Sequence, residues 1–106
     1  MAGIATAIIG AIIVILGIIN MTGNISSLHG YHRKNVTEEN RKPFGRLVGL
    51  GTLIIGVSVM LFGGAMALFD DNEAIVLTAT ALLIVGIVVG MIITFRAMHK
   101  YNGGIF

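Results

Sequence analysis

The chain has 106 residues, of which 56% are hydrophobic and only 11% are charged, and its formal net charge is +2. A soluble domain carries about 25% charged residues, so this composition argues against a soluble globular protein. The length allows one domain, and the absence of cysteine excludes disulfides and thiolate chemistry.

Three long runs, residues 2–28, 47–69 and 74–95, contain no Asp, Glu, Lys or Arg. Each is at least as long as the roughly 20 residues that cross a hydrocarbon core about 30 Å thick. Lipid offers the backbone no hydrogen-bond partners, so such runs form helices or closed barrels. Because the two-residue alternation of barrel strands is absent, we expect an all-α integral membrane protein with three transmembrane helices in a single domain, residues 1–106.

We expect the first helix over about residues 3–29. No basic segment precedes it and no small-x-small cleavage motif follows it, so we interpret it as a retained span and not a signal peptide. Gly23 or Gly30 can end it, because glycine adopts the left-handed conformation after a helix without a side-chain penalty. We place the end before Gly30.

A polar hinge over residues 30–42 should connect this helix to the second one, which we expect over about residues 43–68. Pro43 fits the first turn of a helix but not its interior. An acidic turn over residues 69–73 follows, and we expect the third helix over about residues 74–100. Asp71 or Asn72 can cap that helix, with Glu73 in its first turn.

The basic residues predict the orientation of the chain. In a three-span model all seven lie on one side of the membrane: Arg33, Lys34, Arg41, Lys42, Arg46, Arg96 and Lys100. By the positive-inside rule, the hinge and the C-terminus should be cytoplasmic and the N-terminus outside. The first five form a cluster that can contact lipid headgroups or an acidic segment of a partner.

Small residues recur every seven positions along each predicted helix. A seven-residue step drifts only about 20° around a helix, so each set forms a nearly straight stripe. Small residues allow helix backbones to approach closely in lipid, as in a glycine zipper. The stripes consist of Gly3, Gly10 and Gly17; Gly49, Gly56 and Gly63; Gly51, Ser58 and Ala65; and, on the third helix, Ala79, Gly86, Gly90 and Ala97.

The second helix carries two of these stripes on nearly opposite faces, because Gly49 and Gly51 are roughly 200° apart around the axis. An open row of three helices would use both stripes within the chain. A triangle would leave one stripe outward for a symmetric partner. We expect a triangle and therefore a homo-oligomer, with one of these two stripes at the contact between copies.

Candidate catalytic or cofactor groups are few. No ionisable residue lies within the spans, where transporters and proton pathways usually carry one, and Thr52, Ser58, Thr78, Thr80 and Thr94 can bond back to their own helices. His29 and His32 are the only metal-ligand candidates, but a zinc site needs three or four ligands. We expect no enzyme activity, no cofactor, no metal and no nucleic-acid partner.

The run from Gly30-Tyr31 through Val36-Thr37-Glu38-Glu39 into Phe44-Gly45-Arg46-Leu47 resembles a family of small three-helix bacterial membrane proteins of unknown function. The layout matches over the whole chain, and the motif matches from about Gly30 to Gly56. Two positions depart from the family pattern, since His32 replaces an asparagine and Thr37 a serine. The hinge also resembles that of membrane proteins that give immunity to membrane-active toxins.

These features favour a non-enzymatic interaction protein in the bacterial cell membrane, either an immunity-type protein or an accessory subunit of a membrane complex. It would act through its glycine stripes and basic hinge, with membrane lipid and another copy or subunit as partners. The alternative is a small oligomeric transporter or channel.

Overall fold

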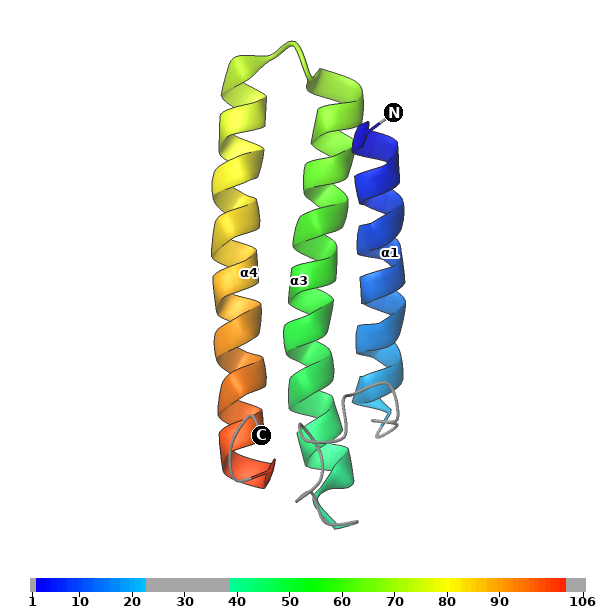
Figure 1. Cartoon of the computed structure of the whole chain (residues 1–106), viewed down its shortest axis with the longest axis vertical. Coiled ribbons are helices and arrows are strands. Elements are labelled where there is room, and N and C mark those ends of the chain that lie inside the picture. The colour runs from blue at the N-terminus through cyan, green and yellow to red at the C-terminus, as the bar shows by residue number, and fades with distance from the viewer. Residues whose placement is uncertain (1, 23–38, 103–106) are drawn as a thin grey trace.

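The computed structural model describes residues 2–22 and 39–102. In this part of the chain it contains three helices, α1 (Ala2–Met21), α3 (Arg41–Phe69) and α4 (Glu73–Asn102), shown in Figure 1. Each helix is long and apolar enough to cross a membrane. The predicted all-α, three-helix architecture is thus confirmed, and it indicates a multi-pass membrane protein.

The helix boundaries follow local hydrogen bonding. α1 ends at Met21, and Thr22 forms a turn in which its backbone N–H donates to the carbonyl of Ile19 (3.2 Å). The predicted continuation of this helix to residue 29 and its end at Gly30 lie outside the described residues. α3 begins at Arg41, and its first bond runs from Phe44 N–H to the Asn40 carbonyl (2.9 Å). Pro43 therefore lies in the first turn, where its missing N–H leaves no bond unmade.

The turn between α3 and α4 uses the expected cap. The side-chain oxygen of Asn72 accepts a hydrogen bond from the backbone N–H of Ile75 (3.2 Å), and Asn72 N–H donates to the Phe69 carbonyl (3.0 Å). Glu73 occupies the first turn of α4, where the helix dipole favours an acid.

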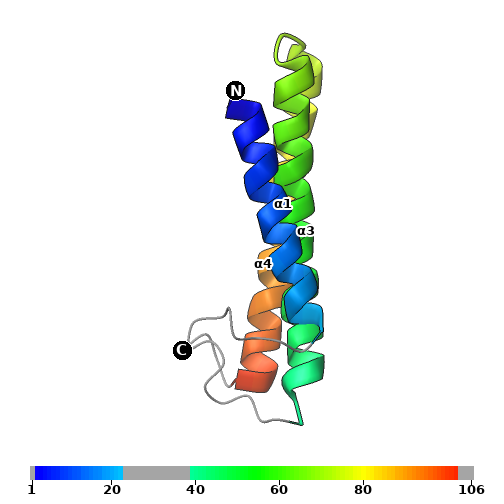
Figure 2. The same cartoon turned by 90° about the vertical axis from the view of Figure 1, so that its right-hand side faces the viewer.

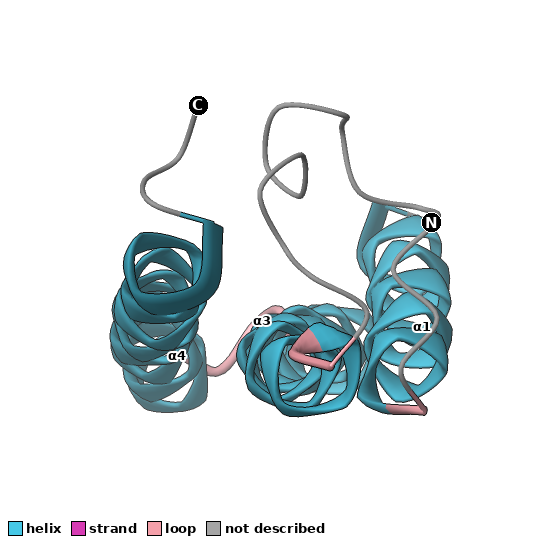
Figure 3. Ribbon diagram, turned by 90° about the horizontal axis from the view of Figure 1, so that it is seen from below, coloured by secondary structure: helices cyan, strands magenta, loops and turns pink. Residues whose placement is uncertain are grey.

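The three helices form an open row with α3 in the middle, as the end-on view in Figure 3 shows. α3 contacts both α1 and α4, whereas α1 and α4 do not contact each other within the described residues. Figure 2 shows α1 lying obliquely across one side of α3. The expected triangle is therefore wrong, because the two opposed faces of α3 direct its neighbours to opposite sides.

The helices differ in length, and this separates the two ends of the row. α1 has 20 residues, which corresponds to about 30 Å, whereas α3 has 29 and α4 has 30, or about 44 Å. The excess length gathers at the end that carries Arg41 and Lys100, here called the basic end. The opposite end, with Asp70, Asp71 and Glu73, is here called the acidic end.

A small apolar cluster joins α3 to α4 at the basic end. Its buried members are Phe44, Val48, Ala97 and Met98, and Leu47 and Tyr101 pack against them. The rings of Phe44 and Tyr101 meet edge to face, with centroids 6.2 Å apart and an interplanar angle of 77°, a geometry that aromatic pairs prefer. This cluster fixes the spacing of the two helices beyond the end of α1.

Candidate functional site

The α1–α3 seam is built from backbone contacts between two rows of glycine. Gly3 lies against Gly63 and Ala67, Gly10 against Gly56 and Met60, and Gly17 against Gly49 and Leu53. A methyl group at Gly10 would lie 2.5 Å from the Met60 nitrogen, and one at Gly56 would lie 2.7 Å from the Val14 nitrogen. Since both obstacles are backbone atoms, this seam has no room for any side chain at these positions.

The α3–α4 seam is close only in its basic half. Gly51 lies against Gly90 and Thr94, and Ser58 lies against Gly86. Here the nearest atoms include side chains, namely the hydroxyls of Ser58 and Thr94 and the branched chain of Ile55. The two helices therefore meet partly through side chains, which can yield more readily than backbone.

The hydroxyl groups of the spans mostly bond to their own helices, as predicted. The hydroxyls of Ser58, Thr78 and Thr80 donate to the carbonyls four residues earlier, each at 2.8 Å. Thr94 differs, because its hydroxyl oxygen is buried and has no hydrogen-bond partner among the described residues. This oxygen lies against Gly51, in the space that a side chain at Gly51 would need.

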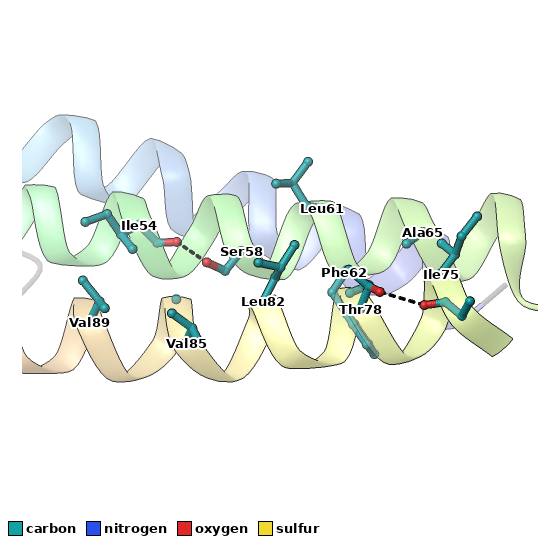
Figure 4. A pocket seen from close by; sticks show the side chains of 13 residues that line it. Ile54, Ser58, Leu61, Phe62, Ala65, Ile75, Thr78, Leu82, Val85 and Val89 are labelled. Atoms are coloured by element: carbon teal, nitrogen blue, oxygen red, sulfur yellow. Dashed lines mark hydrogen bonds between the residues drawn. The ribbon is translucent and has the colours of Figure 1, made fainter. Parts of the chain in front are cut away.

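In its acidic half the α3–α4 seam opens into an apolar groove of about 720 Å³, here called the acidic-half groove (Figure 4). Small residues from both helices line it, and bulkier side chains such as Phe62 and Leu82 complete its walls. The small residues are Ser58 and Ala65 of α3 and Ala74, Ala79 and Gly86 of α4. Sequence spacing identified four of these as stripe residues but missed Ala74 and the opening of the seam.

A second groove of about 690 Å³ lies at the basic end, here called the basic-end groove. Leu47 of α3 and a face of α4 line it, including Ile92, Ile93, Phe95, Arg96, Ala97, His99 and Lys100. The Lys100 ammonium lies 5.2 Å from the centre of the Tyr101 ring, within range of a cation–π contact. Sequence analysis assigned Arg96 and Lys100 only to topology, because nothing in their spacing revealed a groove.

The remaining candidate residues divide between exposed and undescribed positions. Arg41, Lys42 and Arg46 are exposed on the first turns of α3. Arg33, Lys34, His29 and His32 lie outside the described residues. Within residues 2–22 and 39–102, no three His, Cys, Asp or Glu side chains come together in a way that could hold a metal ion.

No protein-family model matches this chain, and neither the curated proteins nor the solved structures contain a significant match to it. The resemblance of the hinge to bacterial three-helix proteins and to immunity proteins stays a hypothesis.

Proposed function

We propose that this chain is a non-enzymatic, multi-pass protein of the bacterial cell membrane that binds another membrane protein laterally, as an accessory or immunity-type subunit. The observation that carries this proposal is the open row. Each outer helix has one neighbour among the described helices, and the seam between α3 and α4 opens into an apolar groove lined by small residues. Small residues are the ones that let a further transmembrane helix approach closely.

The row also changes where a partner would bind. The stripe Gly49–Gly56–Gly63 faces α1, and Gly51 and Ser58 of the second stripe face α4 of the same chain. Ala65, the third member of the second stripe, lines the acidic-half groove. The acidic-half groove brings accessible small residues of two helices together. We therefore place the partner's transmembrane helix in this groove.

Site-directed photo-crosslinking in native membranes tests this assignment. A photoreactive residue at Leu61 or Leu82, which line the groove and are 66% and 63% exposed, should give one defined protein adduct. The matched positions Ile8 and Ile12, 56% and 54% exposed on α1, should label lipid only. An adduct of twice the chain mass would identify a second copy as the partner, and equal labelling from all four positions would refute a groove site.

A substitution that fills the groove provides the control for specific capture. Ala79→Leu places an isobutyl group in the groove and should abolish the adduct from Leu82. Ala81→Leu makes the same change at an exposed position of α4 that does not line the groove, and it should leave the adduct intact. Flux of solutes through liposomes containing the chain, lost in Ala79→Leu, would instead favour a transporter or channel.

The proposed orientation has its own test. All the basic residues of the described helices lie at one end of the row and the acidic turn at the other, so the positive-inside rule places the basic end in the cytoplasm. A reporter fused after Phe106 should be active in the cytoplasm, and a reporter inserted at Asn72 should be active outside. Cytoplasmic activity of the Asn72 insertion would reverse the orientation.

A further inference from the structure

The basic-end groove lies at the depth where hydrocarbon meets headgroups. The last turn of α1 is level with Gly49 of α3, which contacts Met21, and Gly51 contacts Thr94 of α4. Because the 20 residues of α1 match the hydrocarbon thickness of about 30 Å, this level marks one edge of the hydrocarbon. Arg96 and Lys100 then lie about 3 Å and 9 Å beyond it, among the headgroups.

The lining of this groove changes from apolar to basic across that same level. Ile92 and Ile93 lie on the hydrocarbon side, while Arg96, His99 and Lys100 lie on the headgroup side. Leu47 of α3 lies about 3 Å beyond the edge, at the depth of Arg96. The side chains of Arg96 and Lys100 are exposed, and neither pairs with a carboxylate within the described residues. An anion at headgroup depth would therefore find two available cationic groups next to an apolar channel.

We propose that the basic-end groove binds one anionic phospholipid, with its phosphate at Arg96 and Lys100, the start of an acyl chain against Leu47, and the rest of that acyl chain along Ile92 and Ile93. Charge complementarity selects the anionic headgroup, because basic pockets between transmembrane helices attract such lipids. The apolar lining selects a lipid over free phosphate, which has nothing to place against the isoleucines. The site rests on the membrane integration proposed above but not on the orientation or the partner.

Native mass spectrometry of the detergent-solubilised chain tests the site. The probes are phosphatidylglycerol, phosphatidylcholine with the same acyl chains, and inorganic phosphate. The double variant Arg96→Gln/Lys100→Gln should bind phosphatidylglycerol about thirtyfold more weakly than wild type, since each basic residue near anionic lipid contributes a several-fold effect. Phosphatidylcholine should bind weakly to both proteins.

The matched control is Arg41→Gln/Lys42→Gln, which removes the same charge from exposed positions at the same end that do not line the groove. It loses the same diffuse attraction, so its affinity should fall less than about threefold. Equal losses of phosphatidylglycerol affinity in the two double variants would show that the lipid is attracted by the overall positive charge of this end, and would overturn the site. Equal binding of the two lipids by wild type, or full displacement of phosphatidylglycerol by millimolar phosphate, would also overturn it.

A third variant tests the acyl-chain half of the site while the charges stay in place. Ile92 is 51% exposed, so Ile92→Trp can fill the groove without disturbing the helix seam. This substitution should weaken phosphatidylglycerol binding, and wild-type affinity in this variant would refute the proposed position of the acyl chain. Alkaline extraction of native membranes tests membrane integration separately. Release of the protein from the membrane at alkaline pH would count against the proposed function and not against the groove residues.

Discussion

The two seams of α3 solve the same packing problem with different residues. On the α1 side, glycine faces glycine at three successive levels, and backbone lies against backbone along the whole length of α1. On the α4 side, glycine faces glycine at one level, Gly51 against Gly90, and otherwise faces serine, threonine or isoleucine side chains, and the helices are close only in the basic half. The comparison indicates that glycine facing glycine at successive levels gives a continuous contact, whereas a single glycine pair flanked by side-chain contacts gives a seam that a groove can interrupt.

A leucine substitution at the centre of each seam should give the largest difference in stability between the two seams. Gly56→Leu forces an isobutyl group against the backbone of Val14 and the carbonyl of Gly10, so the unfolding free energy in mild detergent should fall by about 3 kcal/mol or more. Ser58→Leu should cost less, about 1–2 kcal/mol, because the new side chain can turn into the neighbouring acidic-half groove. Equal losses, measured by denaturant titration, would show that the two seams are equally tight.

Two adjacent glycines provide a finer test within the α1–α3 seam. A methyl group at Gly63 would lie 2.7 Å from the Gly3 carbonyl oxygen and 2.8 Å from the Ala7 Cα, whereas one at Gly64 would have nothing within 4 Å. Gly63→Ala should therefore destabilise by about 1–3 kcal/mol, and Gly64→Ala should change stability by less than about 0.5 kcal/mol. Thermal unfolding in nanodiscs measures both, and a similar shift for the pair would contradict the seam.

The smallest effect, and the most specific, concerns rescue across the α3–α4 seam. A methyl group at Gly86 would collide with the side chain of Ser58, and the next atom is the Ile54 oxygen at 3.9 Å. Gly86→Ala should thus cost about 1 kcal/mol, and the added change Ser58→Gly should restore most of this loss. At Gly10 the obstacle is the Met60 backbone, so no side-chain deletion on α3 should rescue Gly10→Ala.

Seven-residue spacing predicted the faces that carry Gly3, Gly10 and Gly17 of α1 and Gly49, Gly56 and Gly63 of α3, because the helical repeat determines which residues share a face. Ala65 and Ala79, predicted in the same way, line the groove. It could not by itself decide between a row and a triangle. A triangle needs a contact between α1 and α4, and the other faces of α1 carry exposed isoleucines such as Ile8, Ile12 and Ile15. These bulky faces give α4 no close-packing surface, so α3 is the one helix that contacts α1 in the described part of the chain.

The groove and the hydrogen bonding of individual hydroxyl groups could not be predicted from the sequence, for physical reasons. The acidic-half groove depends on how far α3 and α4 separate beyond the contact of Ser58 with Gly86, and residue spacing does not determine that distance. Whether a hydroxyl bonds to its own helix depends on its rotamer and its neighbour. Ser58 and Thr94 are both half-buried hydroxyl residues of this seam, yet of the two only the Ser58 hydroxyl donates to its own helix.

Since α1 and α4 do not touch over residues 2–22 and 39–102, the three helices have the energetics of a linear array. Each seam contributes its own free energy to the stability of the fold. The two contributions add and do not reinforce each other, as in repeat proteins whose units contact only adjacent units. α4 can then detach while α1 and α3 stay paired, which makes partial unfolding from the α4 side the lowest-energy opening of the fold. Because α1 and α3 are also synthesised before α4, the glycine-paired hairpin can assemble first and serve as the template on which α4 docks.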